Sequence, residues 1–485
     1  MNRQTLAVTI GTVALLLIAI VLLYASPSPE PNPPVRPNAG GQAKVKAKRP
    51  RAPAANRLPA AKLIHKREIP DDRPAAPSGA PNVVVIVPST QRKDQWSLYG
   101  GPENTTPFIA SQVQRYGVKM ADALSVAVSP HENAVALVTG HLPHELGAIE
   151  PSQKRNGRPL PRSVHTMAEH FSRAGWFAMG VSANHHFNAR MGQFQGFDWY
   201  RDSQPFSLMK DRRIPARQAV RFALRRVAER SEAEQARPLY LQIALVDSHK
   251  PFRVAPKDFE PFVGPDHEIA PYRATIRMQD DAISDLVQGL SEVGITHENT
   301  LFVVVSDQGE GLNMPQHHRE QHGFVLYQSV VQIPWVMWGP GLPKNAEVKG
   351  LASTIDVAPT VVALAGLGAE GFQGMSHAAA VRAGGATKRT EAYADTLFRG
   401  AHRASLWTPT RQCQKDYGST FTLLDDAFVD GCFDRQADPD FLAPIEDAAL
   451  MARLESEHAR LMALVAKGEE AEDAGDEGAV EGDPE

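Results

Sequence analysis

Three short polar segments stand where ligand-binding or reactive side chains are expected. Each directly follows a run of apolar residues, and they are Pro88-Ser89-Thr90, Asp247-Ser248-His249 and Asp307-Gln308-Gly309. The first run, Val83–Val87, reads VVVIV, which is typical of a strand buried on both faces of a sheet. In parallel sheets, ligands bind at the carboxyl ends of the strands. These segments are therefore the first candidates for a functional site.

Two histidine-rich segments offer a second kind of chemistry. The sequence QHHREQH contains His317, His318 and His322, a composition that suggests zinc. Adjacent histidines on a strand point to opposite faces, however, and no nearby cysteine completes a tetrahedral ligand set, so we do not expect zinc. The segment Asn184-His185-His186 follows another expected strand. Its histidines line the cleft in one interpretation and lie on the surface in the other.

Strand-like and helix-like segments alternate along the body of the chain. Further apolar runs are Leu239–Val246, Leu301–Ser306 and Ile333–Gly339. Between them, Ile276, Ile283, Leu286 and Leu290 recur at helical spacing, and another helix follows Ser163, a candidate N-cap. This alternation predicts an α/β fold with a mostly parallel central sheet flanked by helices.

The N-terminus predicts a membrane anchor. Leu6–Tyr24 carries no charge, and its length nearly matches the ~30 Å hydrocarbon core. Leu23 is a poor −3 residue for signal-peptide cleavage after Ala25, so residues 1–25 are expected to be retained. Arg3 on the short side places the remainder outside the cytoplasm, in a bacterial periplasm or at the cell surface. Nine Lys/Arg between residues 44 and 67 argue against this orientation, but they begin some distance past the membrane.

Composition separates a folded body from two polar ends. Residues 26–80 are Pro, Ala and basic residues, which predicts a disordered tether, and residues 468–485 contain nine acids, which predicts a disordered tail. The formal net charge of −4 gives no reason to expect nucleic acid as a partner. The two cysteines, Cys413 and Cys432, can close a small loop in an exported protein, but the sequence leaves their pairing open.

The order of the motifs resembles the sulfatases, within the alkaline-phosphatase-like superfamily. PNVVVIVPSTQRKDQWSLYGG resembles their first strand and R-x-D turn, ALVTGHLPHELG the segment after their nucleophile, and SHKPF their H-x-P-aromatic loop. NTLFVVVSDQGE, HGFVLY, IPWVMWGPG and CFDRQADP continue the series, so that the resemblance runs from about Pro81 to Val465. It implies a sulfatase-like core over residues 81–393 and a smaller subdomain over residues 394–467.

The resemblance also implies a chemistry and its residues. Sulfatases hydrolyse sulfuric esters with a divalent cation, usually Ca²⁺, and related enzymes of the superfamily act on phosphate esters. Asp307 and Gln308 match two metal-binding positions, and Ser89 stands where the family has a metal-binding Asp. His249 matches the histidine that contacts the substrate, and His322 matches the Lys-or-His position that meets the ester anion. The implied ligand is thus a sulfate or phosphate ester.

The nucleophile motif is where this chain departs from the family. The position of the nucleophilic Cys or Ser, which matures to formylglycine in sulfatases, falls on Pro130, which has no nucleophilic atom. Ser129 takes this role if the loop is one residue shorter. The family's Arg, four residues further on, falls on Ala134 or Asn133. Neither cysteine lies in a C-x-P-x-R motif, which argues against formylglycine maturation.

Three hypotheses for function remain open. The domain has an eroded hydrolase site that binds an anionic ligand or a protein partner without turnover, or it is an active sulfatase or phosphoesterase with a rearranged site, or it is a non-catalytic envelope scaffold. The second would use Ser129, Asp307, Gln308, His249 and His322. Asp307 and His249 also have purely structural interpretations, as a turn cap and as a donor to loop carbonyls.

Overall fold

The computed structural model describes residues 64–66, 73–149, 158–202, 213–263, 269–312, 322–420 and 428–477. The expected anchor, most of the expected tether, His317 and His318, and the last eight residues of the acidic tail lie outside this part. No helix among the described residues is both long and apolar enough to cross a bilayer.

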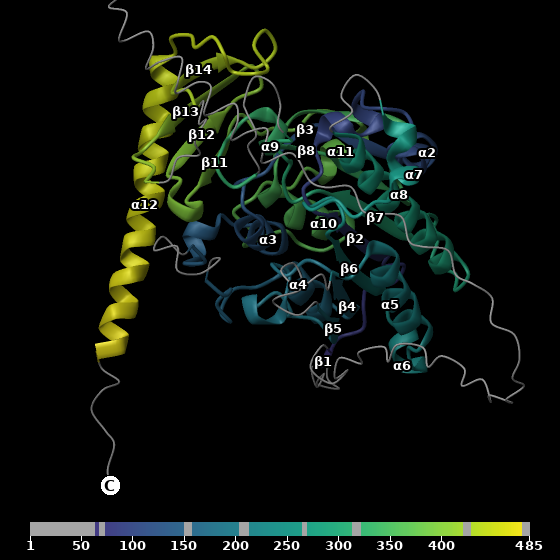
Figure 1. Ribbon diagram of the computed structural model, residues 1–485. Coiled ribbons are helices and arrows are strands. Elements are labelled where there is room, and N and C mark those ends of the chain that lie inside the picture. The colour runs from purple at the N-terminus through teal and green to yellow at the C-terminus, as the bar shows by residue number, and fades with distance from the viewer. Residues whose placement is uncertain are drawn as a thin grey trace, which may run out of the picture. The chain divides into compact units, whose positions relative to one another are not determined.

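The core is a ten-stranded sheet with the strand order β1-β5-β4-β6-β2-β7-β9-β3-β10, in which β8 also pairs with β3 (Figure 1). The strands are β1 (Ile64–Lys66), β2 (Asn82–Pro88), β3 (Gly117–Leu124), β4 (Phe177–Ser182), β5 (Trp199–Arg201), β6 (Leu239–Leu245), β7 (Thr300–Val305), β8 (Gln332–Ile333), β9 (Trp335–Trp338) and β10 (Ala346–Ser353). The central strand β2 is parallel to β6 and β7, whereas β9 runs antiparallel to β7 and β3. The predicted α/β class with a mostly parallel sheet is confirmed.

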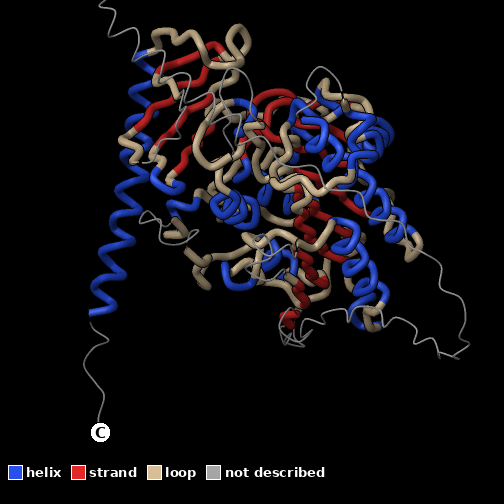
Figure 2. The backbone as a smooth tube through the Cα atoms, in the orientation of Figure 1, coloured by secondary structure: helices blue, strands red, loops and turns tan. Residues whose placement is uncertain are grey.

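Helices cover both faces of this sheet because β2 is apolar on both. Val83, Val85 and Val87 pack on one side against α3 (Pro130–Thr139), α4 (Met167–Arg173), α10 (Val357–Leu364) and α11 (Ala378–Ala383). Val84 and Ile86 pack on the other against α2 (Pro107–Tyr116), α5 (Ala216–Ala228) and α8 (Ala270–Ser291). Figure 2 shows the red strands between these blue helices. Short helices α6 (Glu232–Gln235), α7 (Pro256–Phe259) and α9 (Gln328–Val331) complete this part.

Helix α4 starts later than the sequence suggested. Its N-cap is Thr166 rather than Ser163, because the Thr166 hydroxyl accepts the Glu169 N–H while the Glu169 carboxylate accepts the Thr166 N–H. This reciprocal capping box satisfies two backbone donors at once. The apolar spacing in α8 behaves as expected, with Ile276, Ile283 and Leu286 all buried.

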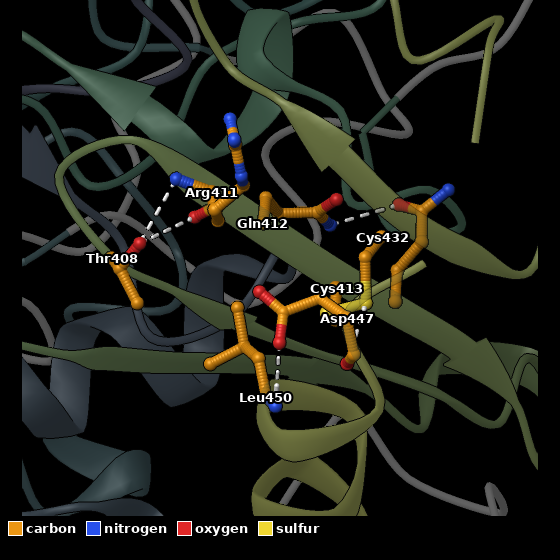
Figure 3. Close-up of a disulfide and its surroundings, with 8 residues drawn as sticks. Thr408, Arg411, Gln412, Cys413, Cys432, Asp447 and Leu450 are labelled. Carbon is orange, nitrogen blue, oxygen red and sulfur yellow. Dashed lines mark hydrogen bonds between the residues drawn. A yellow bond between two sulfur atoms is a disulfide. The ribbon is translucent and has the colours of Figure 1, made fainter. Parts of the chain in front are cut away.

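A second, four-stranded antiparallel sheet and a long helix form the carboxyl-terminal part. The strands are β11 (Ala392–Thr396), β12 (Arg403–Trp407), β13 (Arg411–Asp416) and β14 (Gly431–Asp434), followed by α12 (Ala448–Glu477). Figure 1 shows α12 in yellow along this sheet. Cys413 and Cys432 face each other on β13 and β14 and form a disulfide (Figure 3). Beside it, the Asp447 carboxylate accepts the Leu450 N–H and so caps the start of α12.

The folded part extends beyond both of its expected limits. Strand β1 lies within the segment predicted to be tether and pairs with β5, and Arg73 forms an ion pair with Asp198 at 3.0 Å. At the other end, α12 continues through the first ten residues of the segment predicted to be a disordered tail. Composition alone did not reveal the extension around Arg73, because a buried ion pair leaves no apolar run.

The Arg73–Asp198 pair provides a test of whether the folded part begins before Pro81. Asp198 is 5 % exposed, and Arg73 also donates to the Ser172 hydroxyl at 2.8 Å. Arg73→Ala strands a buried carboxylate, so we expect it to lower the free energy of unfolding by about 2 kcal/mol in urea melts. Arg221→Ala, which removes an exposed arginine from α5, is the control and should change this energy by less than about 0.5 kcal/mol. Equal effects of the two substitutions would place Arg73 outside the cooperative unit.

Candidate active site

The sheet order brings all three polar segments together. Because β2 lies between β6 and β7, the residues after these strands meet at one edge. Ser89, Asp307 and Ser248 are all fully buried there. The Ser248 hydroxyl donates to the Ser89 carbonyl, and the Ser306 hydroxyl donates to the Pro88 carbonyl at 2.8 Å. The turns after β2, β6 and β7 are therefore one hydrogen-bonded unit.

The Asp307 carboxylate is fully engaged by protein donors. One oxygen, Oδ2, accepts the Ser89 hydroxyl at 2.8 Å, and the other, Oδ1, accepts the backbone N–H groups of Thr90 and Gln308, each at 2.8 Å. Thr90 adopts a left-handed conformation with φ +56°, which is uncommon outside glycine. Burial raises the pKa of Asp307 to about 6, although these three hydrogen bonds favour its ionised form. Asp307 ties the end of β7 to the turn after β2.

These residues do not form a donor set suited to Ca²⁺, which takes six to eight oxygen ligands, several of them carboxylates. Asp307 is the one carboxylate among the three expected ligands, and the Ser89 hydroxyl hydrogen is directed at it. The amide oxygen of Gln308 is approached by Asn133 Nδ2 at 3.4 Å. In the described part of the chain, no cluster of three His, Cys, Asp or Glu side chains is arranged to bind a metal.

Ser129 and Pro130 begin helix α3, which opens onto this edge. Ser129 is the N-cap residue and Pro130 the first helical residue, a position that suits proline because its missing N–H has no helical partner there. The Ser129 side chain makes no capping hydrogen bond. Asn133 braces the loop before it by donating to the Ala127 and Ser129 carbonyls at 2.7 and 3.2 Å. The structure thus places a serine hydroxyl without a capping role beside the site.

A buried ion pair that the sequence did not reveal sits next to Asp307. Glu310 is fully buried, and its two oxygens accept the backbone N–H and the ring Nδ1–H of His322 at 2.9 and 3.0 Å. Burial alone would raise the pKa of Glu310, but the charge and hydrogen bonds of His322 lower it to about 2. Burial alone would lower the pKa of His322, and the Glu310 carboxylate instead raises it. His322 is therefore held as a cation at a fixed orientation.

The other histidines near His322 are neutral. His249 lies with its ring centroid 4.9 Å from that of His322, and its Nδ1 donates to the Lys250 carbonyl at 2.6 Å. Burial, and then the charge of His322, lower the pKa of His249 to about 3. His186 is 8 % exposed, and burial lowers its pKa well below the usual value. The cleft interpretation of Asn184-His185-His186 therefore fits better than the surface one.

Several buried polar atoms of this region have no protein partner. They are Nδ1 of His131, Nδ1 of His185 and Nε2 of Gln308. Because His131 Nε2 lies 3.1 Å from the Ala148 carbonyl and so carries the ring hydrogen, its Nδ1 is a free acceptor. A buried polar atom without a partner costs about 1–3 kcal/mol. Such unpaired donors and acceptors favour a polar ligand.

With this geometry in place, comparison with known proteins identifies the family. The sulfatase family model matches residues 81–367, and the chain belongs to the sulfatase family, whose members usually use a divalent metal. It is 23 % identical to arylsulfatase A of Bos taurus over 342 residues, which cover 60 % of this chain and 65 % of that protein. It is also 28 % identical to arylsulfatase K of the dog, Canis lupus familiaris, over 95 residues. This match covers 20 % of this chain and 17 % of that relative's length.

Solved structures agree on the fold. A protein of the core locus by which Bacteroides thetaiotaomicron metabolises multiple glycosaminoglycans superposes with a TM-score of 0.64 and 16 % identity, over 80 % of this chain and 97 % of its own. The phosphonate monoester hydrolase of Agrobacterium radiobacter gives a TM-score of 0.62 with 16 % identity, over 80 % and 96 % of the two chains. At these identities the likeness establishes the fold alone.

The Ser89–Asp307 contact leads to a prediction about metal dependence. Ser89→Asp sets two buried carboxylates against each other, which is unfavourable unless a cation or a proton neutralises one of them. We expect this variant to lose about 2 kcal/mol of stability in EDTA and to regain it in millimolar Ca²⁺. Thermal melts with EDTA or Ca²⁺ measure both effects.

Ser89→Ala is the matched control for this experiment. It removes the same hydroxyl without adding charge, so its melting temperature should fall but should not respond to Ca²⁺. The wild-type protein should respond to neither EDTA nor Ca²⁺. A wild-type melting temperature that drops in EDTA would mean that Asp307 binds a cation in spite of Ser89.

Proposed function

We propose that this chain is a sulfatase-family protein that binds an anionic ester, a sulfate or a phosphate, without metal-assisted hydrolysis. The observation that carries this proposal is the Ser89–Asp307 hydrogen bond, because it occupies the carboxylate that a catalytic cation would need. Without the cation, the ester loses the positive charge that would stabilise its transition state.

Loss of the nucleophile supports the same conclusion. Pro130 has no atom that can attack sulfur or phosphorus, and the family's anion-holding Arg is replaced by Ala134 or Asn133. Asn133 is committed to backbone carbonyls of its own loop. Losses within one catalytic unit are not additive, and each alone removes orders of magnitude in rate.

The remaining groups are suited to binding an anion. The ring of His322 is charged because Glu310 compensates it, and with its Nδ1 held by Glu310, its Nε2–H is left to donate to an ester oxygen. His249 Nε2 is an acceptor, because the ring hydrogen lies on Nδ1. This combination fits a charged ester group next to a hydroxyl. One structural relative was solved with its substrate D-glucosamine-2-N,6-O-disulfate, which has such groups.

Ser129 supports a second candidate function, that of an active esterase with a rearranged site. Its hydroxyl makes no capping bond at the N-terminus of α3, where the helix dipole favours an anion. An active esterase with a rearranged site would use this hydroxyl as its nucleophile, with His249 and His322 beside it. This alternative requires turnover that Ser129→Ala abolishes.

We also propose that residues 1–25 anchor the protein in a membrane and that the folded part lies outside the cytoplasm. The uncharged run Leu6–Tyr24 and the disulfide Cys413–Cys432 support this placement. Membrane fractionation of cells, with protease added from outside, tests it. A protein recovered in the cytosol and protected from protease would exclude this placement. It would also exclude the hypothesis of an envelope scaffold.

The metal and the ester are tested separately on the full-length protein. After dialysis into trace calcium, elemental analysis should find well below one equivalent of calcium, and Asp307→Ala should leave this value unchanged. One equivalent that disappears in Asp307→Ala would contradict the proposal and restore metal-dependent hydrolysis. A panel of sulfate and phosphate esters should then show no turnover above that of Ser129→Ala.

Binding is tested with inorganic sulfate and phosphate by calorimetric titration in EDTA. His322→Gln removes the cation and should weaken binding at least about tenfold, which corresponds to roughly 1.4 kcal/mol for a charge-assisted hydrogen bond. The control His165→Gln replaces an exposed histidine on the segment before α4 and should leave affinity unchanged. If wild type binds neither anion in EDTA, the anion-binding function is wrong and the scaffold hypothesis takes its place.

A further inference from the structure

A second cluster of titratable groups lies away from the candidate active site, where α12 packs on the second sheet. The apolar face of α12 consists of Leu450, Leu454, Leu461 and Val465, all buried, and His458 stands in the middle of this stripe at 4 % exposure. An apolar residue at this position would continue the stripe. A histidine there must instead satisfy both ring nitrogens, because an unpaired buried polar group is costly.

A chain of four hydrogen bonds, two of them made by His458 itself, links His458 to the core. We call the residues joined by these bonds the histidine latch, and they are His144, Asp395, Tyr393, His458 and His402. The distances are 2.8 Å from His144 Nε2 to Asp395 Oδ2, 3.2 Å from Tyr393 Oη to Asp395 Oδ2, 2.8 Å from Tyr393 Oη to His458 Nδ1, and 3.0 Å from His402 Nε2 to His458 Nε2. The ring of Tyr417 also stacks on His458 with centroids 3.8 Å apart.

The latch also reaches the loop that carries Ser129. Asp395 lies on β11, and its backbone N–H donates to the Val126 carbonyl at 3.1 Å. Asp395 also forms an isolated β-bridge with Ala127. His144 lies in the 3-10 turn Pro143–Leu146 that follows α3. The latch therefore joins α12 and the second sheet to both ends of the segment that contains α3.

The hydrogens in the latch can be arranged in one way around an ionised Asp395. Tyr393 must donate to the carboxylate, so His458 Nδ1–H must donate to the tyrosine oxygen. His458 Nε2 is then an acceptor, and His402 Nε2–H donates to it. Both nitrogens of His458 are thus used while the ring is neutral. The imidazole pair can take up one proton at most, because a second would set two N–H groups against each other at 3.0 Å.

We propose that the histidine latch opens in acid and releases α12 from the core. In the unfolded or detached state, His402 and His458 each bind a proton near their ordinary pKa of about 6.5. The closed latch holds fewer protons, so lowering the pH favours the open state. The latch is an acid-sensitive contact between the carboxyl-terminal helix and the loop before Ser129.

The direction of each shift agrees with this geometry. Burial lowers the pKa of His458 to about 4, against the opposing charge of Asp395, and burial also lowers the pKa of His402. A base whose folded pKa is depressed contributes stability above its unfolded pKa, and this stability is lost as the pH falls toward the folded value. The window for His458 therefore runs from about pH 6.5 down to about pH 4.

Other charged groups surround the latch on every element packed against it. They are Glu132 on α3, Glu145 in the turn after α3, Glu391 before β11, Arg403 on β12, Lys415 and Asp416 on β13, Tyr417 directly after β13, and Arg453, Glu455, Glu457 and Arg460 on α12. Ion pairs join Lys415 to Glu455, Arg403 to Asp416, Arg453 to Glu391, and Arg460 to Glu145 and Glu457.

Glu132 acts against the latch histidines. Burial, and then the charge of Asp395, raise the pKa of Glu132 to about 7. The folded state therefore takes up a proton there as the pH falls, which stabilises it in acid. A comparison between wild type and a variant of His458 removes this contribution, because both proteins contain Glu132.

Hydrogen exchange of the full-length protein tests the latch. The readout is the protection factor of amides 450–465, which corrects for the intrinsic pH dependence of exchange. From pH 7.5 to 5.5 we expect protection of α12 in wild type to fall about tenfold relative to His458→Gln, the effect of one histidine with a depressed pKa. Glutamine supplies one donor and one acceptor at the same place but does not titrate. His165→Gln is the control and should show the wild-type response.

Two results would overturn the proposal. One is a wild-type α12 that is equally protected at both pH values, and the other is an equal loss of protection in wild type and His458→Gln. Should His458→Gln not fold, an NMR titration of His458 in wild type decides the matter. The latch requires its protonation midpoint to lie below 6.5 and the protection of α12 to fall between pH 6.5 and that midpoint. A midpoint at 6.5 or above with α12 still protected excludes it.

Discussion

A buried carboxylate at the end of a central strand must be neutralised or fully hydrogen-bonded, and much of this structure follows from how Asp307 meets that requirement. Its three donors come from the turn after β2 and from its own turn. These donors stabilise the ionised carboxylate with dipoles that the protein supplies. Ser89 is the decisive residue, because an acid there would need a counterion that a hydroxyl does not.

Next to Asp307, the site contains the positive charge of the His322 side chain. His322 is charged because Glu310 stands against it in a region that excludes water. The same burial keeps His249 and His186 neutral, since a second and third imidazolium so close would be strongly unfavourable. The outcome is a cationic His322 paired with the Glu310 carboxylate, next to Asp307 and to neutral imidazoles.

The carboxyl-terminal sheet also buries titratable groups, at its interface with α12. It must hold α12 and the loop before Ser129 together, and it does so with an apolar stripe interrupted by one histidine. A purely apolar stripe would be insensitive to pH. The buried hydrogen-bonded chain through Tyr393 makes this contact depend on protonation instead, because His458 satisfies both of its partners only while its ring is neutral.

Much of the architecture was readable from local patterns. The β-branched run Val83–Val87 and the helical spacing in α8 predicted a doubly covered, mostly parallel sheet because burial on two faces or on one stripe has a direct signature in residue order. Pro130 at the expected nucleophile position predicted a departure from the family motif from side-chain chemistry alone, with Ser129 as the alternative nucleophile. The extra folded residues around Arg73 escaped prediction because an ion pair and the small side chains of Ala76 and Ala80, rather than an apolar run, hold them against the core.

Only the tertiary structure decided what the polar residues do. Ser89 and Asp307 are 218 positions apart in sequence, and their contact exists because β2 and β7 are neighbours in the sheet. The charge of His322 depends in the same way on Glu310, and the neutrality of His458 on Tyr393, 65 positions away. Residue types thus set which chemistry is available to this chain. Long-range packing decides which groups are buried, paired and charged, because these energies arise between segments that the linear sequence does not place together.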